Sequence, residues 1–213
     1  PLKQRRCPLY TSDIETILDD LAKEIHDLYS DVSSDPMGVG IAAPGTVNAQ
    51  TGIVNMELMD GWHEVLLAAR FSERLNLPVV VVNQTHAAAL GEKWYEGREQ
   101  VTDLLYIRMG TTVDAGIILD GKLHGGKVST AGTIGHMTVD PNGERCTCGN
   151  YGCLNTIAST PALLSTTRSR LKEDSASMLM AMVEGKPAFL TMDHLMQAVQ
   201  AGDSLAVEIF SEA

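Results

Sequence analysis

The chain has 213 residues, of which 44% are hydrophobic, so it is long enough to fold around one large core or two small ones. Its formal net charge of −11 argues against the chain gripping a nucleic-acid backbone by itself, because that affinity comes largely from Lys and Arg. No stretch approaches the roughly 18 consecutive apolar residues of a membrane span, and residues 1–13 lack the apolar core of a signal peptide. These features predict a soluble cytoplasmic protein.

The first part of the chain has the pattern of an α/β layer. Residues 12–30 carry apolar residues at helical spacing, and Ser12 followed by Glu15 has the form of a capping box. The apolar stretch 37–45 and the β-branched run 77–83 predict strands, the second of them buried on both faces. A helix is predicted between them, and the order strand, helix, strand favours a parallel sheet.

The second part of the chain changes from paired strands to helices. The predicted elements are a helix at 85–97, strands at 103–109 and 115–121, and helices at 156–173, 175–185, 192–202 and 203–213. The two strands would be joined around Gly110, and Asp203 would cap the last helix. Because the sequence starts without a strand before its first helix and stops within a helical pattern, we expect both ends to be cuts through a larger protein.

Three of the four cysteines lie within eight residues and follow a histidine. One imidazole and three thiolates form the ligand set that Zn²⁺ takes in closed tetrahedral sites, and the predicted ligands are His136, Cys146, Cys148 and Cys153. Glycines and a Pro-Asn-Gly turn between them suit a tight metal loop. A redox or unligated cysteine cluster is the alternative, although the C-x-C spacing strains a disulfide between Cys146 and Cys148. Four protein ligands leave no open position, so the predicted ion is structural.

Five segments of the sequence occur in the order in which a known family has them. They are GIAAPGTVNAQTGIV, GWHEV, LNLPVVVVNQTHAAALGE, LLYIRMGTTVDAGIILDGKLHGG and GTIGHMTVDPNGERCTCGNYGCLNTIAS. They resemble the ROK family of bacterial sugar kinases and sugar-responsive transcriptional repressors. The resemblance implies an actin-like ATPase (ribonuclease H-like) α/β fold with two lobes and a sugar and nucleotide cleft between them. It predicts a partial N-terminal lobe at 1–92 and a partial C-terminal lobe at 93–213, which holds the zinc loop 136–153 and a helical end.

The sequence departs from the family's kinases at the residues of catalysis. Kinases of the family have Asn-Asp where this sequence has Asn83-Gln84, and the Asp takes the proton from the sugar hydroxyl. An amide has no basic lone pair at neutral pH, so Gln84 would not do that work. The family's second phosphate loop, Gly-Thr-Gly-x-Gly, is replaced by residues 110–114, which lose two glycines and gain Asp114, and the first phosphate loop is absent from this sequence. The resemblance therefore implies a member with no catalytic residue and disfavoured ATP binding.

The sugar-binding positions have also changed. Thr133 and Asn155 stand where family kinases have glutamates, while His136 matches a histidine that binds zinc with one ring nitrogen and faces the sugar with the other. The resemblance thus gives Asn83, Gln84, Thr133, His136 and Asn155 as ligand-binding residues. Because three acidic positions have become neutral and polar, we hypothesise a ligand that carries its own negative charge. His86, where the family often has Asn, is open to a packing role or to pocket contact.

Together these features predict the sugar-sensing and oligomerisation domain of a ROK-family transcriptional repressor. A sugar or sugar derivative, bound in the interlobe cleft beside the zinc loop, would favour one lobe arrangement. This would change the spacing of DNA-reading helices across a homodimer or tetramer, with the helix-turn-helix outside this chain and no membrane partner. Two alternatives are an ATP-dependent hexose kinase of the family with a displaced base, and a zinc-stabilised pseudokinase that acts only through protein contacts.

Overall fold

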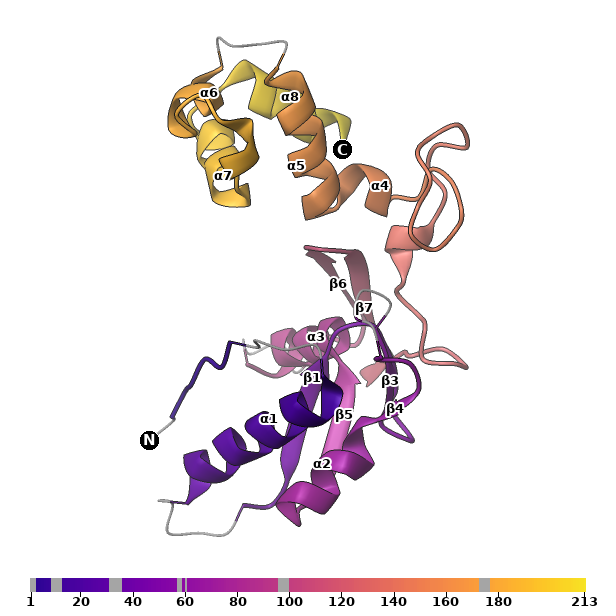
Figure 1. Ribbon diagram of the computed structural model, residues 1–213. Coiled ribbons are helices and arrows are strands. Elements are labelled where there is room, and N and C mark those ends of the chain that lie inside the picture. The colour runs from indigo at the N-terminus through magenta and orange to yellow at the C-terminus, as the bar shows by residue number, and fades with distance from the viewer. Residues whose placement is uncertain are drawn as a thin grey trace. The chain divides into compact units, whose positions relative to one another are not determined.

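The computed structural model describes residues 3–8, 13–30, 36–56, 59, 61–95, 100–172 and 177–213. The chain forms two compact units (Figure 1), unit 1 with Pro1–Tyr106 and Gly116–Gly132 and unit 2 with Ile107–Ala115 and Thr133–Ala213. It therefore passes between the units at three places. Within these described ranges, no helix combines the length and the apolar character that a membrane span requires. The predicted lobe boundary between residues 92 and 93 lies inside a helix, and it stays a prediction.

Unit 1 contains the α/β layer that the sequence predicted. Its elements are α1 (Ile14–Tyr29), β1 (Val39–Ala43), β2 (Thr46–Asn48), β3 (Ile53–Asn55), β4 (Val65–Leu66), α2 (Leu67–Leu75), β5 (Val79–Asn83) and α3 (Gln84–Tyr95). Strands β1 and β5 pair in parallel, from Val39 opposite Val79 to Ala43 opposite Asn83, which confirms the predicted parallel sheet. Strands β2, β3 and β4 form a separate antiparallel sheet.

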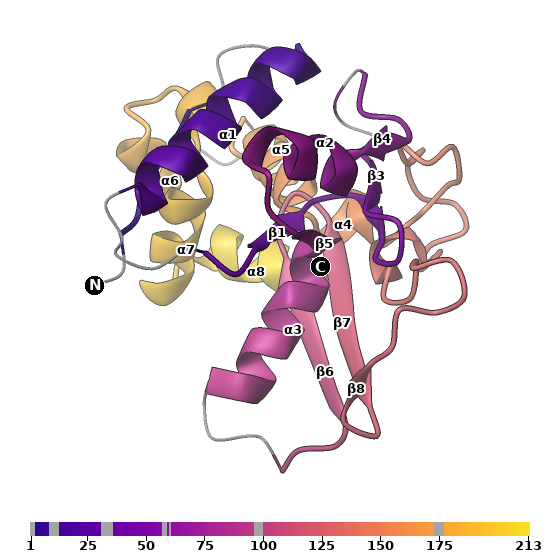
Figure 2. The ribbon, with the colours of Figure 1, turned by 90° about the horizontal axis from the view of Figure 1, so that it is seen from below.

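The core of unit 1 covers only one face of β5. Apolar side chains of α1 and α2, among them Leu18 and Phe71, pack with Val81, which is 1% exposed. Figure 2 shows these two helices side by side next to the β1 and β5 strands. Val80, on the opposite face of the strand, is 60% exposed. The prediction that this strand is buried on both faces is therefore wrong, because no described element of unit 1 covers the Val80 side chain.

The cap of α1 differs from the prediction. The helix begins after Asp13, whose carboxylate accepts a hydrogen bond from the backbone N–H of Thr16 at 2.9 Å. Ser12 lies outside the described residues. Glu15, the predicted second half of a capping box, instead bonds Arg70 and Arg74 of α2 at 2.6 and 2.5 Å. The helix itself is confirmed, but its capping box is wrong because the cap is Asp13, which places Thr16 and not Glu15 at the third helical position.

Three strands form the sheet through which the chain passes between the units. They are β6 (Leu104–Met109), β7 (Val113–Leu119) and β8 (Lys122–Leu123), in the order β6-β7-β8. The predicted pairing of these two strands, β6 and β7, around Gly110 is confirmed. The N–H of Gly110 donates to the carbonyl of Thr112 at 3.1 Å across the turn. Helix α3 approaches β7 closely at Gly116, where an added Cβ would lie 2.7 Å from the carbonyl oxygen of Thr85.

Unit 2 contains short helices in addition to the strand segments that it shares. The helices are η1 (Ile134–His136), α4 (Asn155–Ala158), α5 (Thr160–Arg170), α6 (Met178–Met182), η2 (Pro187–Phe189), α7 (Met192–Gln200) and α8 (Ser204–Glu212). A core that includes Leu163, Leu195 and Ile209 joins α5, α7 and α8.

Asp203 confirms the predicted cap of the last helix and has a second role that the sequence did not predict. Its carboxylate accepts the N–H of Ala206 in α8 at 3.0 Å and the N–H of Met178 in α6 at 2.9 Å. Burial would raise the pKa of Asp203, but these N–H groups and the Ser177 hydroxyl outweigh it, so the pKa is lowered. One carboxylate therefore holds the ends of two helices.

Candidate metal centre and ligand-binding residues

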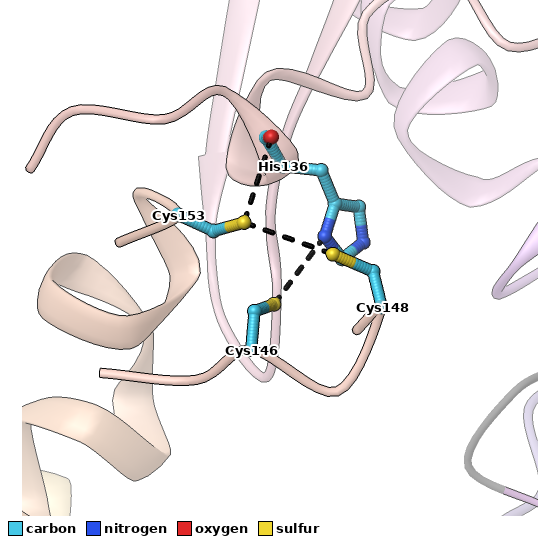
Figure 3. Close-up of side chains that lie close together, drawn as sticks. All are labelled: His136, Cys146, Cys148 and Cys153. Atoms are coloured by element: carbon cyan, nitrogen blue, oxygen red, sulfur yellow. Dashed lines mark hydrogen bonds between the residues drawn. The ribbon is translucent and has the colours of Figure 1, made fainter. Parts of the chain in front are cut away.

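The four predicted metal ligands lie together in unit 2. Their donor atoms, from His136, Cys146, Cys148 and Cys153, all lie within 4.8 Å of one another. Figure 3 shows the imidazole of His136, the last residue of η1, converging with the three thiols of the loop that follows η1. Cys146 and Cys153 are buried, and none of the three cysteines is in a disulfide.

The spacing of the donor atoms fits a tetrahedral ion. With Zn–S bonds of about 2.3 Å and a Zn–N bond of about 2.0 Å, two thiolates lie about 3.8 Å apart and a thiolate and an imidazole nitrogen about 3.5 Å apart. The Sγ atoms of Cys148 and Cys153 are 3.7 Å apart, and Cys146 Sγ is 3.5 Å from Nδ1 of His136. The widest separation, 4.8 Å, would need to close by about 1 Å on binding. A disulfide, with sulfurs about 2.05 Å apart, does not match.

The pKa values of two of the thiols indicate how a bound cation would act on the cluster. Burial raises the pKa of the Cys146 thiol, but hydrogen bonds from Cys148, His136 and Cys153 outweigh it and lower the pKa to about 7. Burial and the neighbouring Cys148 and Cys146 thiols raise the pKa of Cys153 to about 12. Burial and the neighbouring thiols therefore disfavour ionisation of Cys153, and a divalent ion bound here would supply the positive charge that favours its thiolate.

Backbone geometry makes the loop tight enough to hold the cluster. The carbonyl oxygen of Gly152 accepts from the N–H groups of Val139 and Asp140, and the N–H of Gly152 donates to the carbonyl of Glu144. Gly152 has φ +60°, and an added Cβ would lie 1.5 Å from the carbonyl oxygen of Asp140. Only glycine fits this position, which places Cys153 beside the other ligands.

Asn83 and Gln84, two predicted ligand-binding residues, lie at the junction of β5 and α3 in unit 1. The side-chain oxygen of Asn83 accepts the N–H groups of Thr85 and His86 at 2.7 and 3.2 Å, so it caps α3. Its Nδ2 donates to the carbonyl of Gly45 at 2.8 Å. Asn83 is therefore largely committed to the backbone. Gln84 is half-buried, and its amide forms no hydrogen bond with any residue that the structure describes.

Asn155 is likewise committed to the backbone, within unit 2. Its side-chain oxygen accepts the N–H of Val113 at 2.8 Å. The Asn155 amide lies against η1, since a Cβ added to Gly135 would meet Asn155 Oδ1 at 2.2 Å. The structure thus brings Asn155 next to the segment that carries His136. Thr133, the residue before η1, is exposed.

The turn at 110–114, where the resemblance predicted a degenerate phosphate loop, is closed on itself. The N–H of Gly110 donates to Thr112, the N–H of Val113 donates to Asn155, and the Thr112 hydroxyl donates to the Asp114 carboxylate at 2.6 Å. The carbonyl of Gly110 accepts the N–H of Thr160 at the start of α5. Two N–H groups of the turn are therefore engaged, and a carboxylate lies beside them.

Residue types alone did not reveal these backbone roles of Asn83 and Asn155. Asn after a predicted strand and before a predicted helix is a capping signal, which could have identified the first. The second depends on a partner 42 residues away in sequence, and no local pattern marks it.

Comparison with protein families and curated relatives confirms the resemblance. The model of the ROK family matches residues 2–213. A glucokinase from Halalkalibacterium halodurans is 34% identical over 208 residues, which cover 97% of this chain and 62% of that protein. A xylose repressor from Caldicellulosiruptor bescii is 39% identical over 137 residues, which cover 64% of this chain and 34% of that protein. The chain spans less than two thirds of the length of these relatives.

Solved structures confirm the predicted fold. A ROK family glucokinase from Streptomyces griseus, in complex with glucose and AMPPNP, matches with a TM-score of 0.82 and 31% identity over 95% of this chain and 65% of its own. A ROK family transcriptional regulator, a homologue of the E. coli MLC protein, matches with a TM-score of 0.78 and 32% identity over 92% of this chain and 49% of its own. The chain therefore has the actin-like ATPase fold of these proteins.

Proposed function

The chain belongs to the ROK family, and on this premise we propose that it is the sugar-sensing and oligomerisation domain of a transcriptional regulator that does not phosphorylate sugar. The observation that carries the proposal is Gln84. By resemblance it stands where kinases of the family have their catalytic Asp, and it lies at the start of α3. Its amide, which bonds no residue that the structure describes, can bond a sugar hydroxyl but cannot accept its proton. A repressor relative and a solved regulator support this choice.

The closed turn at 110–114 supports the proposal that the protein does not use ATP to phosphorylate a sugar. A phosphate loop needs free backbone N–H groups that point at the nucleotide. Here the N–H groups of Gly110 and Val113 already have protein acceptors. The carboxylate of Asp114 would repel a triphosphate at this turn.

The proposed ligand is a sugar or sugar derivative. We assign its binding to Gln84 of unit 1 and to Thr133 and His136 of unit 2, with Asn83 and Asn155 contributing the polar groups that their backbone bonds leave over. The neutral character of these residues favours a ligand with its own negative charge, such as a sugar acid or sugar phosphate. Calorimetry with the full-length protein should show tighter binding of an acidic sugar than of its neutral parent. Binding of neither class would contradict the hypothesis.

The proposed metal is structural Zn²⁺, held by Nδ1 of His136 and the thiolates of Cys146, Cys148 and Cys153. When bound, it would supply the charge that keeps three thiolates together and would fix the plane of the imidazole. With Nδ1 directed at the thiols, Nε2 is the ring nitrogen left for the ligand. The zinc loop would then contribute to ligand recognition by holding the His136 imidazole in the orientation that the ligand needs.

The proposed mechanism is a population shift. Ligand binding would favour one arrangement of the two units, and across a homodimer or tetramer this would change the spacing of two helix-turn-helix segments that lie outside this chain. The net charge of −11 is consistent with DNA contact through such a segment rather than through this chain. The proposed location is the cytoplasm.

The test uses the full-length gene product. We expect no ATP-dependent phosphorylation of D-glucose or D-xylose, and we expect an active sugar to release the protein from operator DNA in a mobility-shift assay. Gln84→Leu, which keeps the bulk but loses hydrogen bonding, should weaken sugar binding by about tenfold, since one bond to a hydroxyl is worth about 1 kcal/mol. Phosphorylation by the wild-type protein would overturn the non-catalytic proposal.

The second candidate function is an ATP-dependent sugar kinase. The glucokinase of Halalkalibacterium halodurans aligns with 97% of the chain, a wider coverage than that of the xylose repressor, and this favours the kinase. A displaced base would then have to be a carboxylate, and Asp114 is the one in the turn at 110–114. Phosphorylation that Asp114→Asn abolishes would establish this function in place of the first.

A further inference from the structure

We propose that His86 is a positioning residue that anchors the loop 124–132 on α3 and thereby fixes the point from which Thr133 reaches the ligand. This inference rests on the proposed sugar-binding function. His86 does not touch the ligand in this proposal, because the residue is only 7% exposed. It acts through the loop that it holds.

The anchor is one hydrogen bond with a defined direction. Nε2 of His86 lies 3.1 Å from the carbonyl oxygen of Ala131. A carbonyl oxygen only accepts, so Nε2 carries the hydrogen. The bond joins residues 45 positions apart in sequence, and both of them belong to unit 1.

The helix end of this bond is rigid. Asn83 caps α3 by accepting the N–H groups of Thr85 and His86, so the backbone of His86 is fixed directly beside Gln84. The helix also approaches β7 so closely at Gly116 that no side chain fits between them. The imidazole therefore projects from a firm support.

The loop end of the bond lies in the segment between β8 and η1. Between β8 and η1 the described chain forms no helix or strand, and its local closure comes from the N–H of Ala131, which donates to the carbonyl of Gly125 at 3.1 Å. Ser129 has φ +60° and Gly132 has φ +89°. The N–H of Ala131 thus closes the loop, while its carbonyl holds the closed loop on α3.

The position of this bond connects two predicted ligand residues. His86 follows Gln84 by two residues, and Ala131 precedes Thr133 by two residues. Thr133 is also the residue at which the chain enters unit 2. The bond therefore holds the last part of unit 1 before this passage, and its loss would release Ala131 from α3 two residues before Thr133.

The experiment compares three variants of the full-length protein. His86→Gln keeps a donor N–H at nearly the reach of Nε2, His86→Asn keeps an amide that is too short, and His86→Phe keeps a ring without a donor. His63→Gln, at an exposed histidine, is the matched control. The measurements are affinity for D-glucose and D-xylose by calorimetry, hydrogen–deuterium exchange of residues 124–133, thermal midpoint and zinc content.

We expect His86→Asn and His86→Phe to weaken sugar binding about five- to tenfold, as for the loss of one hydrogen bond, and to speed exchange in 124–133. His86→Gln should stay within about twofold of the wild type, and all three should keep their metal. Wild-type affinity in the Asn and Phe variants, or equal weakening in the Gln variant, overturns the proposal. If His86→Phe does not fold, the comparison of Asn with Gln decides.

The same experiment separates this proposal from the proposed function. If the wild-type protein binds neither sugar, the proposed function fails in that respect, and the exchange data alone then test the anchor. Faster exchange of 124–133 in His86→Asn but not in His86→Gln would still establish it. Unchanged exchange in both variants would refute it.

Discussion

Replacement of Asn155 tests whether this residue is a ligand or a support for the turn at 110–114. Its side-chain oxygen lies 2.8 Å from the N–H of Val113, a residue that is 3% exposed. Asn155→Ala removes the acceptor and leaves a buried N–H without a partner, which costs about 1 to 3 kcal/mol. Asn155→Asp keeps an oxygen at the same place, so it should cost less than about 1 kcal/mol.

Hydrogen–deuterium exchange of the Val113 amide is the direct assay. If local opening controls exchange, a loss of 1 to 3 kcal/mol corresponds to roughly 5- to 150-fold faster exchange in Asn155→Ala. Exchange in Asn155→Asp should stay close to that of the wild type. Zinc content and sugar affinity of the full-length protein are measured in parallel. Unchanged exchange at Val113 in the Ala variant, together with lost sugar binding, would refute the supporting role and make Asn155 a direct ligand.

Three further predictions concern the metal loop and the helical part of unit 2. Cys148→Ser should release zinc and weaken the sugar response together, as measured by metal analysis and by release from operator DNA. Zinc loss with an intact response would mean that the loop only stabilises the fold. Gly152→Ala should abolish zinc binding, because the added Cβ would lie 1.5 Å from a backbone oxygen. Gly149→Ala is the control and should retain zinc, because Gly149 also has a positive φ but an added Cβ there meets no atom within 4 Å. Equal zinc content in the two variants would contradict this prediction. Asp203→Asn should lower the free energy of unfolding of the helical core by about 1 to 2 kcal/mol at neutral pH. Because the folded-state pKa of Asp203 lies below 3.8, its ionic contribution is present above that value and is lost as the pH falls through the folded pKa, so the difference between wild type and variant in urea unfolding should shrink in acid; a difference that grows in acid would contradict the reasoning.

The sequence predicted the elements whose signal is local. Helix α1 follows from apolar residues at helical spacing, and the parallel pairing of β1 with β5 follows from a helix that separates two apolar runs. The convergence of His136, Cys146, Cys148 and Cys153 was also predictable, because potential soft ligands crowded in a glycine-rich loop have few other uses. These inferences need no knowledge of a distant partner.

Features that depend on a distant partner were missed. Glu15 has the spacing of a capping box with Ser12, but Asp13 caps the helix and two arginines of α2 bind Glu15. Asp203 was predicted as the cap of one helix, and only the tertiary packing shows that it also binds Met178 of another. The β-branched run of β5 suggested burial on both faces, yet exposure depends on which helices cover the strand, and that is not encoded in the run itself.

The predicted ligand residues already form hydrogen bonds within the fold. These bonds determine which of their polar atoms remain able to bond a ligand. Asn155 has its oxygen on Val113, so Nδ2 is the group that remains, and it donates. If Nδ1 of His136 binds a metal, the neutral ring carries its hydrogen on Nε2, which also donates. Two of the polar groups left for a ligand are therefore donors, where the kinases of the family have an acceptor carboxylate at position 155. A surplus of donors suits an acceptor-rich or anionic ligand. The fold thus favours such a ligand because it already uses the acceptor atoms of these residues, in addition to any effect of the lost negative charge.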